Sequence, residues 1–261
     1  SIETYFNIQK RKYYNHILDE KFFKNTQLSK VQLVEMSNQK GILSDVLIKN
    51  ITDTLENKEQ IILLQNKRGL DKGGIQKIES ILYKFFPKIK ILRYDGDSIQ
   101  KSKEYYNILN TFKEGNADIL LGTQMIAKGL DLPQVTLVGA MLADLGLFIP
   151  DFRAGERGFQ LLYQVAGRAG RGEKPGLAIV QTYHPEHYAI QAAARQEFGP
   201  FYDMEIGYRQ SFRNPPFSQL AKMSYQHTNP IHARNSALDF VGKFRSFLKK
   251  TKTCENLSLE L

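Results

Sequence analysis

The sequence predicts an α/β protein with a parallel β-sheet that carries helices on both faces. Apolar runs of strand length alternate with stretches whose apolar residues recur every three or four positions. Such an alternation is typical of parallel strands joined by crossover helices. Hydrophobic residues make up 42% of the 261 residues, which is enough for one large domain or for one domain with a smaller piece.

The expected elements follow in chain order. The expected strands cover six runs, which are 31–35, 60–64, 90–93, 118–121, 135–139 and 177–182. Two sets of residues fall on one helical face between strands, namely Leu47, Ile48, Ile51 and Leu55, and then Ile75, Ile78, Leu82 and Phe85. Residues 101–113 supply a third crossover helix. We therefore expect a RecA-like or Rossmann-like layer over residues 31–196.

The segments before and after this layer are expected to form other structures. Residues 1–30 are expected to be an entry segment, and 197–261 a linker with the beginning of a smaller α+β domain. Pro215-Pro216 forces an extended break, after which a strand (219–226) and an amphipathic helix (231–248) are expected. The aromatic residues of 197–217 suit either base stacking or packing between domains, and packing is favoured.

The composition indicates which classes of partner to expect. The formal net charge is +9 and the isoelectric point is about 9.4, which favours an anionic partner. A single cysteine, Cys254, excludes an internal disulfide or a cysteine-rich metal site within this sequence and fits a cytoplasmic setting. No apolar run reaches the ~18 residues of a membrane span, so no membrane is expected as a partner.

The stretch "QVAGRAGRGEKPG" (164–176) is a candidate phosphate site. At helical spacing, Phe159, Leu162, Val165 (or Ala166) and Ala169 form a buried stripe. A second, polar stripe contains Gln160, Gln164, Arg168 and Arg171. Gly167 and Gly170 each destabilise a helix by about 1 kcal/mol, which is tolerated where a ligand or another backbone must approach closely. Two guanidinium groups beside such a gap suit a polyphosphate. A surface charge pair or a flexible Arg-Gly segment is the alternative.

A phosphate-cradling loop is not present in this stretch. Gly167 and Gly172 have the spacing of a Walker A motif, but Glu173 stands where the lysine belongs and a helix precedes the motif. Asp19-Glu20 follows no long apolar strand and is a poor Walker B candidate. The chain therefore carries an arginine clamp without the loop that would hold the phosphates.

A second candidate site lies in "ADILLGTQMIAKGLDLPQVTLV" (117–138). Thr123 and Gln124 follow a buried strand at its carboxyl end, where open α/β sheets bind ligands, and their side chains suit a nucleic-acid backbone. Asp131 is placed to accept a hydrogen bond from a ribose hydroxyl. A helix N-cap for Thr123 and a turn for Asp131 are the structural alternatives.

Together these stretches resemble the second motor lobe of superfamily 2 helicases, and more narrowly the replication-restart DNA helicases of the PriA family. The narrower resemblance rests on "GTQMIAKGLD", "PDFRAGER", "QVAGRAGRGEKPG" and "QTYHPEHYAI", supported by "SIETYFN" at the start and "NPPFSQLA" at 214–221. It covers nearly the whole chain and is weakest after about residue 226.

The resemblance implies ATP, with Mg²⁺, bound between two RecA-like lobes and 3′-to-5′ movement along single-stranded DNA. It implies that Gln164, Arg168 and Arg171 face the nucleotide, with Arg171 as the arginine finger. Nucleotide contacts are further implied for Gly129, Asp131, Gly167 and Gly170. DNA contacts are implied for Thr123, Gln124, Asn66, Lys67 and Arg68, although a solvated basic turn remains open for the last three.

The family also implies partners and parts that this sequence lacks. Single-stranded and forked DNA, primosome assembly proteins and single-stranded-DNA-binding protein are the implied partners. The Walker A lysine and the Mg²⁺-binding acid would precede residue 1, so we expect the chain alone not to hydrolyse ATP. The family's zinc module would follow "NKRG" (66–69), where its cysteines are absent. Either the module is lost, or the sequence joins two segments at Gly69-Leu70.

A non-enzymatic nucleic-acid-binding α/β module is the alternative function. Such a module has no need of Gln164, Arg168 and Arg171 on one stripe, and its binding would fall uniformly with salt. A generic RNA helicase is disfavoured, because the stretch "GTQMIAKGLD" resembles that of the DNA helicases.

Overall fold

The computed structural model describes residues 1–16, 29–65, 74–94, 102–123, 132–167, 169, 175–221 and 223–250. Two compact units divide the chain, Ser1–Phe217 and Ser218–Leu261. The elements of the first unit are α1 (Ile2–Gln9), β1 (Lys30–Glu35), α2 (Asp45–Glu56), β2 (Gln60–Gln65), α3 (Gly74–Phe85), β3 (Ile91–Tyr94), α4 (Ser102–Lys113), β4 (Ile119–Gly122), β5 (Val135–Met141), the 3₁₀ helix η2 (Ala143–Gly146), α5 (Ala154–Ala166), β6 (Leu177–Thr182), α6 (Tyr188–Arg195) and α7 (Phe198–Ser211). The second unit contains α8 (Pro230–Lys250).

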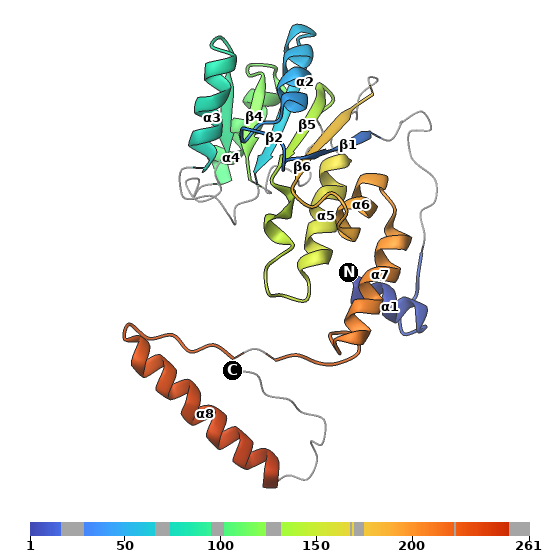
Figure 1. The fold of residues 1–261 in the computed structure, drawn as a ribbon, viewed down its shortest axis with the longest axis vertical. Coiled ribbons are helices and arrows are strands. Elements are labelled where there is room, and N and C mark those ends of the chain that lie inside the picture. The colour runs from blue at the N-terminus through green and yellow to red at the C-terminus, as the bar shows by residue number, and fades with distance from the viewer. Residues whose placement is uncertain are drawn as a thin grey trace. The chain divides into compact units, whose positions relative to one another are not determined.

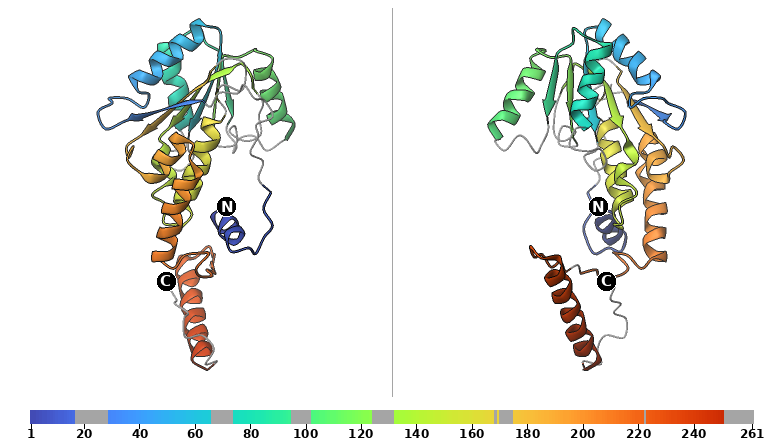
Figure 2. Two further views of the ribbon diagram at one scale, coloured as in Figure 1. Left: turned by 90° about the vertical axis from the view of Figure 1, so that its right-hand side faces the viewer. Right: turned by 60° about the vertical axis from the view of Figure 1, so that its left-hand side comes forward.

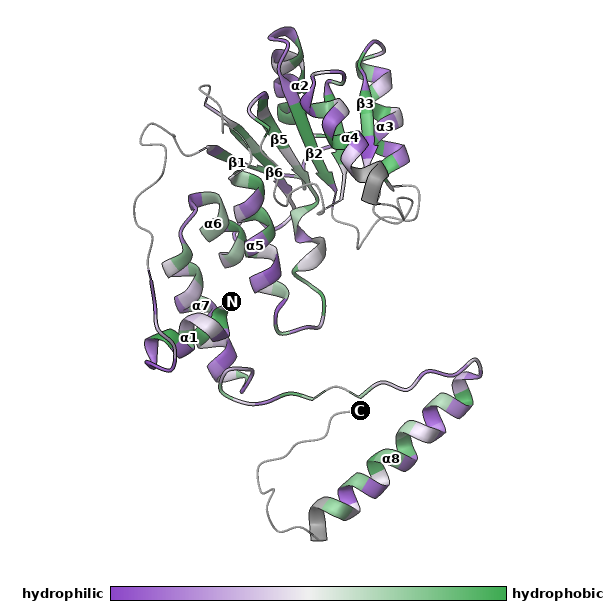
Figure 3. Cartoon of the chain, turned by 180° about the vertical axis from the view of Figure 1, so that it is seen from behind, coloured by the Kyte–Doolittle hydropathy of each residue, from purple (hydrophilic) through white to green (hydrophobic). Residues whose placement is uncertain are grey.

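The six strands form one parallel sheet in the order β1-β6-β5-β2-β4-β3 (Figure 1). Each expected strand is present, with ends that differ by at most two residues from the expected ones. The central strands are buried along their whole length, and Figure 3 shows β2 and β5 as mainly hydrophobic. A strand buried on both faces is the form that a parallel sheet covered by helices requires. The predicted fold class is therefore confirmed.

Alternate residues of each strand supply two separate cores, and helices lie on both faces of the sheet (Figure 2). Ile61 and Leu63 of β2 face a cluster that contains residues of α2 and α3. Ile62 and Leu64 face the other cluster, to which α4, α5, α6 and α7 contribute. Because successive side chains of a strand point to opposite faces, one short run stabilises both helical layers.

The helical stripes expected from the sequence are largely buried. Leu47 and Ile51 of α2, and Ile78 and Leu82 of α3, are almost wholly shielded from solvent. Phe85 is an exception, because its side chain is 54% exposed. It is the last residue of α3, and the next residue, Phe86, packs on the core in its place. Phe85 thus lies within the expected helix but its side chain does not join the buried face.

The region after β6 departs furthest from expectation. Residues 198–211 form α7, a helix that the sequence reading did not predict. Phe201 and Tyr202 of α7 are buried, and Tyr202 packs edge-on against Tyr5 of α1 with ring centroids 4.6 Å apart. Phe201 and Tyr202 thus pack within the first unit, whereas Phe212 is largely exposed. The domain limits at 30 and 197 stay a prediction.

The second unit contains less regular structure than expected. Where a strand was predicted, the described residues of 219–226 form none, because an isolated strand has no partner to complete its hydrogen bonds. The predicted helix is present as α8, with hydrophobic and polar residues alternating along it (Figure 3). No helix in the described part of the chain is long and apolar enough to cross a membrane.

Candidate functional site

Helix α5 presents one apolar and one polar face. Phe159, Leu162, Val165 and Ala166 are buried against the sheet, so the predicted buried stripe is confirmed. Gln160 and Gln164 lie on the other face, where Gln160 is exposed and Gln164 is half-buried. The polar stripe expected to continue to the arginines therefore points away from the sheet.

Two glycines let the start of α5 approach its neighbours closely. A Cβ atom at Gly155 would overlap the Tyr188 hydroxyl and lie 2.8 Å from Glu205 Oε2. A Cβ atom at Gly158 would overlap the end of the Leu147 side chain. The missing side chains fix how near α5 lies to α6, α7 and the segment after η2.

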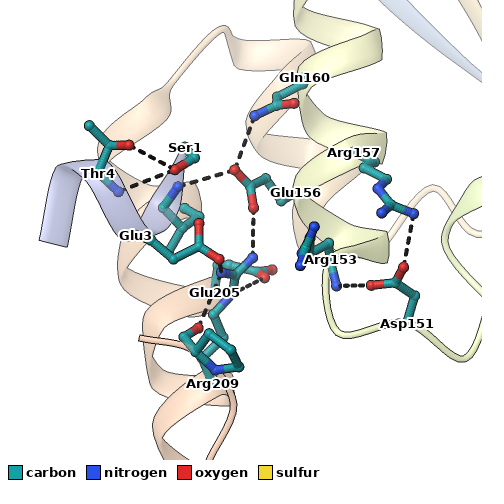
Figure 4. A network of polar contacts seen from close by, with 12 residues as sticks. Ser1, Glu3, Thr4, Asp151, Arg153, Glu156, Arg157, Gln160, Glu205 and Arg209 are labelled. Carbon is teal, nitrogen blue, oxygen red and sulfur yellow. Dashed lines mark hydrogen bonds and ion pairs between the residues drawn. The ribbon is translucent and has the colours of Figure 1, made fainter. Parts of the chain in front are cut away.

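A buried charge network holds the same end of α5 (Figure 4). Arg209 of α7 is only 1% exposed. Its guanidinium donates through Nη2 to Glu156 Oε2 at 2.7 Å, through Nε to Glu205 Oε1 at 2.8 Å and through Nη1 to Glu3 Oε1 at 2.9 Å. It also donates to the carbonyl oxygen of Pro215 at 3.3 Å. One side chain thus joins α1, α5, α7 and the residues after α7.

The carboxylates of this network have further donors. Glu156 Oε1 accepts from the backbone nitrogen of Ile2 and from Gln160 Nε2, each at 3.1 Å. Glu205 Oε2 accepts from the Tyr188 hydroxyl at 2.6 Å. Because each buried oxygen has a partner, the network avoids the cost of an unsatisfied buried charge.

The pKa values agree with this geometry. Burial alone would lower the pKa of Arg209, but its hydrogen bonds to Glu205 and Glu156 outweigh burial and raise it. Burial favours the neutral form of Glu3, but a backbone hydrogen bond and the charge of Arg209 lower its pKa. Burial and then the bond to Glu205 raise the pKa of Tyr188 above its usual range. All three groups therefore keep the protonation states that the network needs.

A cavity of about 280 Å³ lies beside the polar face of α5. Gln160 and Gln164 line it from α5, and Phe198 and Phe201 line it from α7. Of the three residues expected to face a nucleotide, Gln164 is the one that the structure describes, and its side chain borders this open space.

The arginine-bearing segment is described only in part. Gly167 caps α5, and Arg168, Gly170 and Arg171 lie outside the described residues. Ala169 is buried, and its carbonyl oxygen accepts a hydrogen bond from the Ser29 hydroxyl. The carbonyl of Ser29 in turn accepts from Gln196 Nε2 at 3.0 Å. Ser29 thus ties the segment to β1 and to the end of α6.

The second predicted site lies at the carboxyl edge of the sheet. Thr123 directly follows β4 and is 4% exposed. Leu64 of β2 pairs with Gly122 of β4, so the stretches that follow these two strands start side by side. Gln124, Gly129 and Asp131 lie outside the described residues, as do Asn66, Lys67 and Arg68.

The sequence analysis gave no role to the residues of the charge network, to Ser29 or to Gln65. Ser29 and Arg209 gave no signal, because each acts through contacts with residues far along the chain. Gln65 is buried at the end of β2, and its Oε1 has no hydrogen-bond partner among the described residues. A polar residue that ends the apolar run "QIILLQ" was the available signal for Gln65.

A metal ion needs a set of ligand side chains grouped around it. In the part of the chain that the structure describes, no three His, Cys, Asp or Glu residues are grouped to hold a metal ion. With one cysteine in the whole sequence, the residues present do not fit the cysteine-rich zinc module that the family resemblance implies.

Comparison with known proteins identifies a helicase domain and replication restart proteins as similar to this chain. Residues 42–173, about half of the chain, match the family "Helicase conserved C-terminal domain". The replication restart protein PriA of Bacillus subtilis is 47% identical over 67% of this chain and 21% of its own length. The corresponding protein of Borreliella burgdorferi is 28% identical over 96% of this chain and 46% of its own length.

The chain therefore spans less than half the length of these relatives. Among solved structures, the C-terminal domain of the DEAD-box protein Dbp5 is 17% identical over 70% of this chain and 99% of that domain, with a TM-score of 0.44. On the family match and the curated relatives, the chain belongs to the helicase conserved C-terminal domain family and is a PriA-like C-terminal region of a superfamily 2 helicase.

Proposed function

We propose that this chain is the second motor lobe of an ATP-dependent DNA helicase that acts in replication restart. The observation that carries the proposal is the placement of α5. This helix is anchored at its start by Arg209 and borders a cavity with Gln164. It leads directly into the two-arginine segment, inside the stretch that matches the helicase family.

On the nucleotide side, Gln164, Arg168 and Arg171 face an ATP molecule that lies between this lobe and a first lobe. Arg171 is the arginine finger, which stabilises negative charge on the γ-phosphate in the transition state. Gly167 and Gly170 permit close approach, and Gly129 and Asp131 serve the ribose. Mg²⁺ accompanies ATP and neutralises charge on its phosphates.

Single-stranded DNA binds at the neighbouring carboxyl ends of β2 and β4. Thr123 and Gln124 contact the backbone of single-stranded DNA, and so do Asn66, Lys67 and Arg68. The pairing of Leu64 with Gly122 supports this grouping, because β2 and β4 end next to each other at one edge of the sheet. Movement is from 3′ to 5′.

The biological setting follows the relatives' printed role in replication restart. We propose forked DNA as the substrate of the complete protein, with primosome assembly proteins and single-stranded-DNA-binding protein as its partners. The net charge of +9 is compatible with a nucleic-acid partner.

The test is Arg171→Ala in the complete protein that carries this chain. Removal of an arginine finger lowers ATP turnover on the order of 10³-fold, whereas binding to a single-stranded oligonucleotide is expected to persist. Arg195→Ala is the matched control, because Arg195 is exposed on α6 and contacts only Gln191 among the described residues. Its turnover should equal that of the wild type.

Near-normal turnover in Arg171→Ala would refute the finger assignment. If the wild-type protein binds DNA but shows no DNA-dependent ATP hydrolysis, the chain is a non-enzymatic binding module and the proposal is wrong.

A further inference from the structure

A cluster of basic and aromatic residues follows α1. Residues 10–16 read Lys-Arg-Lys-Tyr-Tyr-Asn-His, contain no acidic residue and are exposed throughout. Tyr13 is 56% exposed and Tyr14 is 99% exposed. Two adjacent tyrosine rings are thus left in water beside three cationic side chains.

The backbone that carries the cations is fixed. Lys10, Arg11 and Lys12 each donate a backbone N–H to a carbonyl of α1, namely those of Phe6 at 3.0 Å, Ile8 at 2.8 Å and Asn7 at 2.8 Å. The reversal places Arg11 at a φ of +58°. These bonds make the start of the cluster a defined turn.

Helix α1 is itself held against the first unit. Tyr5 packs edge-on against Phe198 at 5.1 Å, and Phe6 packs against Phe217 at 5.2 Å. The Tyr202 hydroxyl donates to Gln9 Oε1 at 3.0 Å, and Ile2 donates to Glu156. The turn is therefore presented from a packed surface, which lowers the entropy lost when a ligand binds.

The cations of the turn are available for a partner. In the described part of the chain, neither Lys10, Arg11 nor Lys12 forms an ion pair with an acidic side chain, and Lys10 lies over the Phe6 ring at 5.6 Å. Clustered cations beside exposed aromatic rings are the chemistry that binds single-stranded nucleic acid, since cations neutralise phosphates and rings stack on unpaired bases.

We propose that the turn at residues 10–16 is a second contact site for single-stranded nucleic acid, distinct from the carboxyl edge of the sheet. Lys10, Arg11 and Lys12 contact phosphates, and Tyr13 and Tyr14 stack on bases. This second site rests on the proposed function and adds a nucleic-acid contact made by residues outside the sheet edge.

The test measures binding of a fluorescein-labelled oligothymidine to the 261-residue chain by fluorescence anisotropy, over a series of KCl concentrations. The charge variant is Lys10→Gln/Arg11→Gln/Lys12→Gln. Loss of three phosphate contacts should reduce the slope of log affinity against log salt concentration by about 2. The control is Lys49→Gln/Lys77→Gln/Lys88→Gln, which removes the same charge from exposed positions elsewhere and should leave the slope near the wild-type value.

A second pair of variants tests the tyrosines. Tyr13→Ala/Tyr14→Ala should weaken binding roughly 5-fold or more for each ring that stacks, by a factor that changes little with salt. Tyr13→Phe/Tyr14→Phe keeps both rings and should bind like the wild type. Because these side chains are exposed, we expect the thermal midpoints of all four variants to stay close to that of the wild type.

The inference is overturned if the charge variant and its control give the same slope, or if the wild-type chain does not bind the oligonucleotide. Neither result bears on ATP turnover in Arg171→Ala, so the failure of this inference and the failure of the proposed function can be told apart.

Discussion

The two ends of α5 are built differently. At its start, Gly155 touches α6 and α7 so closely that no side chain fits, and Glu156 is locked by Arg209. At its end, the helix is capped by Gly167, which is exposed. A Cβ atom at Gly167 would come no nearer than 3.5 Å to any described atom outside its chain neighbours. The fold fixes one end of the helix and leaves space at the other.

This difference shows how a site residue is positioned from a distance. A helix rises 1.5 Å per residue, so Gln164 lies about 12 Å along the axis from Glu156. Gln160 stands between them and donates to Glu156 at 3.1 Å. Because the helix is stiff over two turns, the anchor at Glu156 sets where Gln164 points.

The largest effect on stability is expected for Arg209→Met. Removal of the guanidinium leaves Glu156 and Glu205 buried without their cation, which should lower the free energy of unfolding by about 3–5 kcal/mol. Urea unfolding measures this loss.

The double variant Arg209→Met/Glu156→Gln separates the cost of the unpaired charge from the cost of altered packing. The introduced glutamine keeps an oxygen that can accept from Ile2 and Gln160 but removes one uncompensated charge, so part of the lost stability should return. If the single variant is as stable as the wild type, or the double variant recovers nothing, the network does not anchor α5.

A smaller loss is expected for Gly155→Ala. The added methyl group would meet the Tyr188 hydroxyl, whose position is fixed by its bond to Glu205, so overpacking should cost about 1–3 kcal/mol. Gly158→Ala is the matched variant on the same helix. There the obstacle is the mobile end of Leu147, and the better helix propensity of Ala offsets up to about 1 kcal/mol. Equal losses in the two variants would mean that the Tyr188 contact is not what fixes α5.

The sequence alone predicted the strands of the sheet and the buried face of α5. Runs such as "QIILL" and the spacing of Phe159, Leu162 and Val165 are local signals, and the structure contains the strands and the buried stripe that they predict. Helix α7 was missed because its first residues include Gly199 and Pro200, which disfavour a helix, although Phe198, Phe201 and Tyr202 recur at helical spacing. Its stability comes from contacts with α1 and α5.

The anchors of the candidate site could not be predicted for a related reason. Glu156 and Arg209 form one ion pair across 53 positions of the chain, and Ser29 reaches Ala169 across 140. No periodicity or motif records which distant residues meet. The glycines of α5 were noticed only near the arginines, whereas the structural need for glycine is strongest at Gly155.

The smallest effect on stability, and the sharpest contrast with Gly155, is expected for Gly167→Ala. Gly167 has a φ of −72°, which any residue adopts, and the described surroundings leave room for a methyl group. Because Ala restricts the unfolded chain, the variant should be as stable as the wild type or gain about 0.4–1 kcal/mol. In the complete protein its ATP turnover should nevertheless fall, on the order of 10²-fold, if the methyl group displaces a nucleotide that approaches this turn. Thermal unfolding and ATP hydrolysis, measured on the same preparation, check both expectations. Unchanged turnover would remove Gly167 from the nucleotide site, whereas a stable but slow variant would show that the ligand, and not the fold, requires this glycine.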